Sequence, residues 1–332
     1  MSTSIDIVYC WCSDDDPVWR EKRLRRAAEF GVELTGAVAG ECRYAENDDL
    51  RHSLRSLCRH APWIGKVHVL VDDDASLPAW LDVQSDRMHV VRHSEVMPRG
   101  SLPCFDSMVI ENYLFRINGL SERFLYANDD MLFARDVSPD FFFAADGLPV
   151  CRYGSSHADE CLRKARTPYQ EALKRGEDLL RAKFGLKGDF AKAYRRVPHH
   201  NVDAYLRSDF ERCYHMFEDE ISLAAKHPFR GPHDIERTLY MGYALCMGRG
   251  HYRQARSRAS LSRAWFKRML RPGYADSLNL THEKWPVAEK LMRRFRPALI
   301  CFNDNESVTS VERAWLRDLY TRLYPGKCEF ER

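Results

Sequence analysis

The segment FLYANDDMLF at residues 124–133 sets an amide and two carboxylates directly after a run of apolar, strand-forming residues. Asn128, Asp129 and Asp130 would be costly to bury without partners or a cation, so we expect a strand that ends in an open site. Two adjacent carboxylates can bind magnesium, which prefers oxygen ligands and often uses only one or two protein carboxylates. The alternative is that either acid caps the next turn, which is the commoner role of an isolated acidic pair.

Two arginines, Arg51 and Arg55, stand four residues apart in DLRHSLRS, a segment with the pattern of a helix. Residues at this spacing lie on one helical face, where two guanidinium groups could bind a phosphate. The alternative is a solvated basic face that pairs with Glu46 and Asp48.

Two loops contain histidines beside other polar residues. VPHHNVDAY carries His199 and His200, and HPFRGPHD carries Arg230 and Asp234. A lone histidine in a loop is usually a surface residue. In a chain that also carries candidate phosphate and metal ligands, a histidine becomes a candidate general base, because its unperturbed pKa of about 6.5 suits neutral pH.

Apolar runs with the pattern of buried parallel strands precede three of the polar groups: IDIVYCWC, KVHVLVDDD and FLYANDD. Helical patterns at residues 47–63 and 106–120 separate them. This alternation predicts an α/β fold with a Rossmann-like, mainly parallel sheet and flanking helices, whose ligands bind beyond the carboxyl ends of the strands. A later run, PALICFNDN at residues 297–305, also ends in polar residues and should reach the same cleft.

Composition favours one globular cytoplasmic protein. The 51 basic and 48 acidic residues leave a net charge of +3, which gives no signature of nucleic-acid binding. The 11 cysteines include no Cys-x-x-Cys pair, and no segment has the pattern of a secretory leader or a bilayer span. The basic segment 249–272 suits anionic lipid head groups or a phosphate-bearing polymer, so we expect peripheral contact with the inner face of the membrane; the alternative is a solvated helix face.

Four blocks of sequence occur in an order typical of one family. They are IDIVYCWCSDDDPVW; RYAENDDLRHSLRSLCRHAPWIGKVHVLVDD with FDSMVIENYLFRINGLSERFLYANDDMLF; HHNVDAYLRS with HPFRGPHDIERTLYMGYAL; and CFNDNES. Through them the sequence resembles the Stealth family of bacterial capsule and exopolysaccharide phosphotransferases, which includes the catalytic part of the eukaryotic enzyme that adds N-acetylglucosamine-1-phosphate to lysosomal glycoproteins. It departs from the family pattern at Ser13, where an acid is expected, and at Val202, where proline is expected.

The resemblance implies transfer of a hexose-1-phosphate, such as an N-acetylhexosamine-1-phosphate, from a UDP-sugar to a sugar hydroxyl. UMP would be released and a phosphodiester linkage formed in bacterial capsule or exopolysaccharide. The partners would be the nucleotide-sugar donor, the growing polysaccharide and the capsule assembly machinery, with no nucleic acid. Two other functions fit the same residues: a metal-dependent glycosyltransferase that releases UDP, and a noncatalytic polysaccharide-binding protein.

The resemblance also implies a role for individual residues. His200, Arg230, Asp234 and Asp130 would be catalytic, with His200 as general base because the spacing to AYLRS favours it over His199. Mg²⁺, or alternatively Mn²⁺, would be held by Asp129, Asp130 and Asp304, and the donor phosphates by Arg51, Arg55 and Arg230. The substrate-binding residues would be Tyr9, Trp11, Asp16, Asn47, Asp48, Arg51, Arg55, Asp72, Asp106, Ser107, Glu111, Asn128, Asn303 and Asn305.

Three parts of the chain are expected under this interpretation. Residues 1–155 would form a nucleotide-sugar-binding α/β part with a GT-A-like sheet, and residues 156–226 a helical accessory insertion. Residues 227–332 would return to the catalytic core and include the basic segment 249–272.

Overall fold

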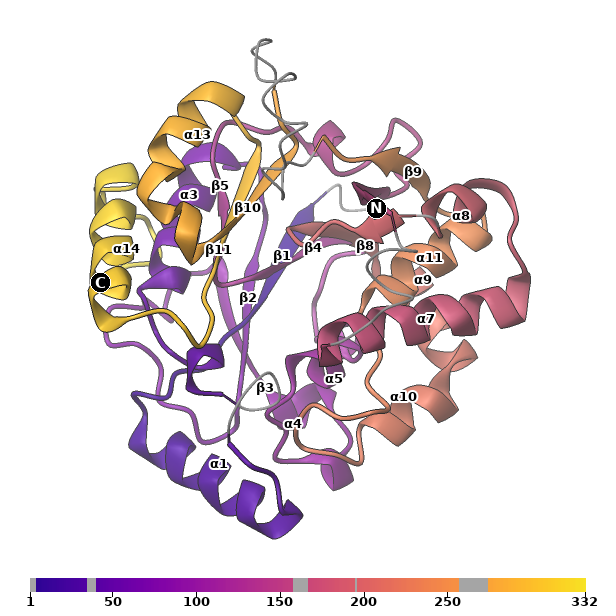
Figure 1. The fold of residues 1–332 in the computed structure, drawn as a ribbon, viewed down its shortest axis with the longest axis horizontal. Helices are drawn as coiled ribbons and strands as arrows, with labels where there is room; N and C mark the ends of the chain where they lie inside the picture. The colour runs from indigo at the N-terminus through magenta and orange to yellow at the C-terminus, as the bar shows by residue number, and fades with distance from the viewer. Residues whose placement is uncertain (1–3, 35–39, 158–166, 195, 257–273) are drawn as a thin grey trace.

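The computed structural model describes residues 4–34, 40–157, 167–194, 196–256 and 274–332. A five-stranded sheet with the order β3-β2-β1-β4-β8 runs through its centre (Figure 1). The first four of these strands are parallel, and β8 is antiparallel to β4. The five strands are β1 Ile5–Cys10, β2 Val67–Val71, β3 Met88–Arg92, β4 Arg123–Asn128 and β8 Asp203–Leu206.

The central strands are apolar on both faces because both faces of the sheet are covered. Ile7, Val69 and Leu125 pack into one hydrophobic cluster, whereas their chain neighbours Val8, Leu70 and Tyr126 pack into another. This alternation follows from the two-residue period of a strand. The α/β fold class with a Rossmann-like, mainly parallel sheet is confirmed.

Two smaller sheets accompany the central one, with the orders β10-β11-β5 and β7-β6-β9. In the first sheet β11 is parallel to β10 and antiparallel to β5. In the second, β6 is parallel to β9 and antiparallel to β7. Their strands are β5 Met131–Phe133, β6 Val150–His157, β7 Arg196–Pro198, β9 His251–Gln254, β10 Ser277–Thr281 and β11 Leu299–Asn303.

Helices gather on both sides of these sheets. α3, α13 and α14 lie together on the left in Figure 1, and α7 to α11 lie on the right. The α-helices are α1 Pro17–Phe30, α3 Asp49–His60, α4 His93–Val96, α5 Ser107–Glu111, α7 Pro168–Phe184, α8 Gly188–Ala193, α9 Arg207–Met216, α10 Glu218–Ala224, α11 Thr238–Cys246, α13 Ala288–Phe295 and α14 Ser310–Leu323. Short 3₁₀ turns are η1 Glu41–Arg43, η2 Arg99–Ser101, η3 Leu114–Arg116, η4 Pro139–Phe141 and η5 His282–Val287.

The structure differs from the sequence-based expectation in several elements. The strands β3, β6, β7, β9 and β10 were not predicted, and the 106–120 helix is reduced to α5 followed by a 3₁₀ turn. The region 156–226 is not helical throughout, because its β8 completes the central sheet. Of the basic segment 249–272, residues 257–272 lie outside the described residues. No helix in the described ranges is both long and apolar enough to cross a bilayer.

Candidate active site at the carboxyl ends of the strands

A cavity of about 930 Å³ opens where β1, β4 and β11 end. Parallel α/β sheets bind ligands at this edge, because neighbouring connections diverge there. The late strand β11 belongs to a separate sheet, yet the residues after it reach the same cavity. The cavity is lined by 11 of the predicted site residues: Trp11, Asn47, Ser107, Asn128, Asp129, Asp130, His200, Arg230, Asn303, Asp304 and Asn305.

Asp129 and Asp130 follow β4 directly and form the acidic part of the wall. Among the described residues neither has an ion-pair partner, and the buried Oδ1 of Asp130 accepts no hydrogen bond. Burial raises the pKa of Asp130 to about 6, and burial followed by the charges of Asp49 and Asp130 raises the pKa of Asp129 well above its usual range. In the described part of the chain their ionised forms thus have no ion-pair partner, and only the weaker effect of the Arg237 charge favours the ionised form of Asp130.

Two further acids, neither of them among the predicted site residues, lie near Asp129. Glu46 accepts a hydrogen bond from Trp11 Nε1 at 2.7 Å, and the buried Asp49 accepts one from Tyr320 Oη at 2.7 Å. Burial is the largest cause of a raised pKa at both acids. They add negative charge behind Asp129.

Asp304 lies in the cavity wall, and two other side chains already donate hydrogen bonds to its carboxylate. Arg313 donates to both of its carboxylate oxygens, at 2.8 and 3.2 Å, and Asn47 Nδ2 lies 3.3 Å from Oδ2. The predicted role of Asp304 as a metal ligand stays a prediction, and a metal ion there would have to share this carboxylate with the Arg313 guanidinium. Within the described ranges, no three His, Cys, Asp or Glu side chains converge as a complete metal site.

Arg43 and Arg230 supply positive charge to the cavity wall. Arg230 Nε lies 3.9 Å from Asp106 Oδ1, and no ion pair of Arg43 is found in the described part of the chain. Partial desolvation, and then the charge of Arg230, lower the pKa of Arg43. Two guanidinium groups that repel each other beside a cavity favour a bound anion.

The predicted phosphate site at Arg51 and Arg55 is wrong in its location. Both side chains bind the buried carboxylate of Glu331, with N–O distances of 2.6 to 2.8 Å, and neither lines the cavity. Arg55 also donates to the carbonyl of Tyr324. The helical face was correct, but it packs against the end of the described chain instead of a ligand.

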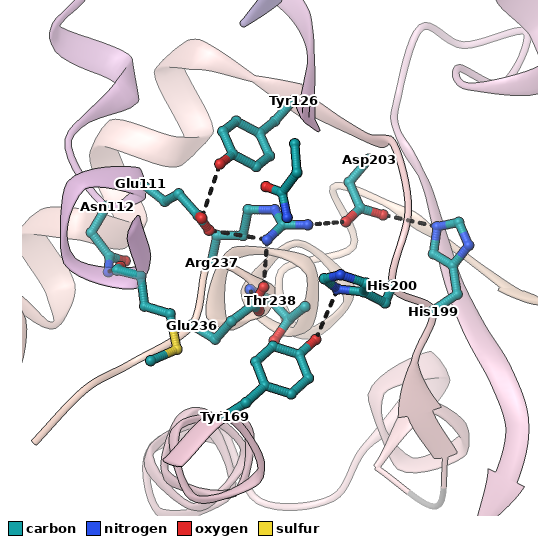
Figure 2. Close-up of polar contacts among 12 residues, drawn as sticks. Glu111, Asn112, Tyr126, Tyr169, His199, His200, Asp203, Glu236, Arg237 and Thr238 are labelled. Carbon is teal, nitrogen blue, oxygen red and sulfur yellow. Dashed lines mark hydrogen bonds and ion pairs between the residues drawn. The ribbon is translucent and has the colours of Figure 1, made fainter. Parts of the chain in front are cut away.

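His200 faces the cavity, whereas His199 does not. The Nδ1 atom of His200 lies 3.4 Å from Tyr169 Oη, and a dashed line marks this contact in Figure 2. Burial and then the charge of Arg237 lower the pKa of His200 to about 4, so that it is neutral at neutral pH. His199 is buried instead, and its Nε2 lies 3.0 Å from Asp203 Oδ1.

Arg237, which the sequence analysis did not include, forms the centre of a buried charge network behind these histidines (Figure 2). Its guanidinium contacts Glu111 at 3.0 Å, Asp203 at 3.2 Å and Glu236 at 2.5 Å. Glu111 also accepts a hydrogen bond from Tyr126. The network ties the histidine loop, α5 and β4 together, and the only signal in the sequence was the acid-rich segment HDIER.

The other predicted site residues, which are six substrate ligands and the catalytic candidate Asp234, have structural roles outside the cavity wall. Tyr9 Oη, in the core, bonds Ser53, and Asp16 caps α1 through the N–H groups of Val18 and Trp19. Asp72 pairs with Lys22 at 2.6 Å. The remaining four are Asp48, which adopts a left-handed conformation before α3; Asp106, which caps α5; Glu111, in the Arg237 network; and Asp234, which accepts from Gly231 N. None of these seven side chains lines the cavity.

Comparison with known proteins identifies the family. The profile described as "Stealth protein CR2, conserved region 2" matches residues 43–151. The chain belongs to the Stealth family. It is similar to two exopolysaccharide phosphotransferases of Streptomyces coelicolor, with 30% and 33% identity, and each alignment covers 99% of this chain. A capsular polysaccharide phosphotransferase of Haemophilus influenzae is 28% identical over 73% of this chain and 65% of its own length.

This Stealth chain aligns with only part of each Streptomyces relative. It spans 33% and 52% of the lengths of the two Streptomyces proteins. Among solved structures it is similar to the galactosyltransferase LgtC in complex with donor and acceptor sugar analogues. That likeness has a TM-score of 0.48 and 12% identity, and it covers 97% of this chain and 96% of LgtC.

Proposed function

We propose that this chain transfers a hexose-1-phosphate from a UDP-sugar to a hydroxyl group of a growing polysaccharide and releases UMP. The strongest support for this proposal is the set of side chains that line one cavity of this Stealth chain. This cavity joins two carboxylates that form no ion pair in the part of the chain that the structure describes, two arginines and a neutral histidine. A phosphoryl-transfer site needs these parts, because catalysis there depends mainly on alignment and charge neutralisation.

The donor diphosphate would bind between Arg43 and Arg230, which are the two arginines of the cavity wall. Guanidinium groups bind phosphate oxygens with directed, charge-assisted hydrogen bonds. Their positive charge would also stabilise the charge that develops on the transferred group and on the UMP leaving group. Trp11 and Tyr44, also in the wall, offer aromatic surface to the nucleotide or sugar.

Asp129 and Asp130 fit a magnesium ion, since neither forms an ion pair within the described residues and Asp130 Oδ1 has no hydrogen-bond partner there. Magnesium commonly takes one or two protein carboxylates and completes its shell with substrate phosphates and water. When bound, it would neutralise charge on the diphosphate. Asn128, on the same strand end, would orient polar groups of the donor.

His200 would remove the proton from the acceptor hydroxyl. With a hydrogen on Nδ1 that is donated to Tyr169 Oη, the Nε2 lone pair is available to accept that proton. The lowered pKa keeps the ring in the neutral form that a base requires. The acceptor oxygen would then attack phosphorus, so the bond between C1 of the sugar and its oxygen is not broken.

The nucleotide released in the reaction tests this proposal. The protein with magnesium would be incubated with a panel of nucleotide sugars and capsule oligosaccharides, and the nucleotide product separated by chromatography. We expect UMP from a UDP-sugar. Release of UDP would replace the proposal with glycosyl transfer, and no acceptor-dependent release with any donor would favour a noncatalytic binding protein.

A further inference from the structure

Two buried carboxyl groups, those of Asp106 and Asp234, lie near Arg230. Asp106, at the start of α5, is 1% exposed, and Asp234, in the loop before α11, is 2% exposed. One oxygen of each accepts a backbone N–H: Asp106 Oδ1 from Met108 at 3.0 Å, and Asp234 Oδ2 from Gly231 at 2.7 Å. The other oxygens, Asp106 Oδ2 and Asp234 Oδ1, are buried and have no donor of their own.

A side-chain hydrogen bond between the two carboxyl groups is among the causes of the pKa shift of each. Two carboxylate oxygens cannot form a hydrogen bond unless one of them carries a proton, and two buried charges in contact repel strongly. A single proton between Asp234 and Asp106 satisfies both unpartnered oxygens at once. Asp106 is the better site for the remaining charge, because it caps a helix and lies 3.9 Å from Arg230.

The surrounding charged and titratable groups come from three segments. Arg230 lies on the loop of Asp234, and Arg43 approaches from η1. Cys104 and Tyr44 are also near, but burial raises the pKa of each, so both stay neutral. Burial, and then the charge of Asp106, raise the pKa of Asp234 to about 8. The pair can thus keep one proton across the neutral range.

We propose that Asp106 and Asp234 share one proton and act as a positioning pair that holds Arg230 at the cavity wall. Neither residue lines the cavity, so both act through Arg230. With one proton, two guanidinium charges face a single carboxylate charge, and a net positive charge remains for a bound phosphate. Loss of the proton adds a second carboxylate, cancels that charge and draws Arg230 toward the pair. The proposal rests on the proposed function only for the identity of the anion.

Asp234→Asn provides the sharpest test, because asparagine keeps the shape and a hydrogen-bond donor but cannot lose a proton. UMP would serve as the probe, and its affinity would be measured by calorimetry from about pH 6.5 to 9.5. We expect wild-type affinity to fall about tenfold above pH 8, as a neighbouring charge is added, while the Asn variant stays nearly constant. Asp234→Ala, which removes the donor, should bind more weakly than Asp234→Asn at every pH.

Thermal unfolding gives a second readout that needs no ligand. Because the folded-state pKa of Asp234 is raised above 3.8, the wild type loses stability as pH rises from about 4 to 8, whereas Asp234→Asn does not lose this contribution. The melting temperature of the Asn variant relative to wild type should rise over that window and level off above it. A constant difference would overturn the shared proton, even if UMP bound to neither protein and the proposed function failed. If the shared proton is present but the UMP affinity of the two proteins changes equally with pH, the positioning role is wrong.

Discussion

The contacts of Glu331 test whether Arg51 and Arg55 bind the donor phosphates or stabilise the fold. The pKa of this carboxyl gives the size of the expected stabilisation. Burial alone would raise the pKa of this carboxyl, but hydrogen bonds from Arg55, Arg51 and the Cys328 N–H lower it from 4.5 to about 2. A depression of that size corresponds to about 3 kcal/mol of stability at neutral pH. Since the folded-state pKa is lowered, this contribution is present above pH 4.5 and is lost as the pH falls toward 2.

The perturbation is the double variant Arg51→Ala, Arg55→Ala. Its free energy of unfolding in urea at about pH 7.5 should fall by about 3 kcal/mol, because the buried Glu331 carboxylate keeps only a backbone donor. The variant should also lose less additional stability than wild type between about pH 5 and 3. Glu331→Gln is the matched control, since it removes the charge and leaves both arginines in place.

Activity of the same double variant decides the question. If the arginines are structural, the folded fraction should transfer sugar phosphate within a few-fold of the wild-type rate. A variant with wild-type stability and a loss of about a hundredfold in transfer would refute this reasoning and return both arginines to the donor phosphates.

Three further predictions concern the cavity. Arg43→Ala and Arg230→Ala should each lower kcat/KM by about 10²–10³-fold with little change in melting temperature, and Lys should rescue poorly; normal turnover in both would remove the phosphate site. His200→Ala should lower kcat by about 10²–10⁴-fold and retain the affinity for UMP. His199→Ala should instead lower the free energy of unfolding by about 1–3 kcal/mol, because Asp203 loses a buried partner. The reverse pattern would show that the wrong histidine was chosen as the base. Magnesium at a hundred times its Kd at about pH 7.5 should stabilise the fold by about 2.7 kcal/mol, and the same concentration should stabilise it less at about pH 5, because protons compete at Asp130, whose pKa is about 6. An Asp130→Asn variant that gains the same stability would place the ion elsewhere.

The strand-end residues were the part of the site that the sequence predicted well. Asn128, Asp129 and Asp130 follow an apolar run, and a charged group after a buried strand must lie at the sheet edge. The same reasoning placed Asn303 in the cavity, although it could not show that β11 belongs to a second sheet. The periodicity of apolar residues identifies a strand and its two faces, and the last residue of the strand follows from the same pattern.

Partners from distant parts of the chain were beyond sequence reasoning. The spacing of Arg51 and Arg55 gave the correct helical face, but nothing local indicated that Glu331 covers it. Asp304 was likewise predicted as a metal ligand from the resemblance alone, and nothing in the sequence indicated that Arg313 pairs with it. Charge alone does not distinguish a ligand-binding group from one that is already paired.

The buried cation Arg237 was missed for a related reason. Its segment reads as a polar loop, whereas the fold surrounds it with carboxylates from α5, β8 and its own loop. The helical interpretation of residues 156–226 missed β8 because DAYL is only four residues long. A short strand gains its identity from its neighbour in the sheet, here β4.

The bond that breaks in the donor tests the central claim most directly. A UDP-sugar would be synthesised with oxygen-18 in the bridge between C1 and the β-phosphorus, and the products analysed by mass spectrometry after transfer to the acceptor. If the chain transfers sugar phosphate, the label must appear in the phosphodiester product, and the released UMP must be unlabelled. Label found in released UDP, with an unlabelled glycosidic product, would show that the C1–O bond was cleaved and would contradict phosphotransfer.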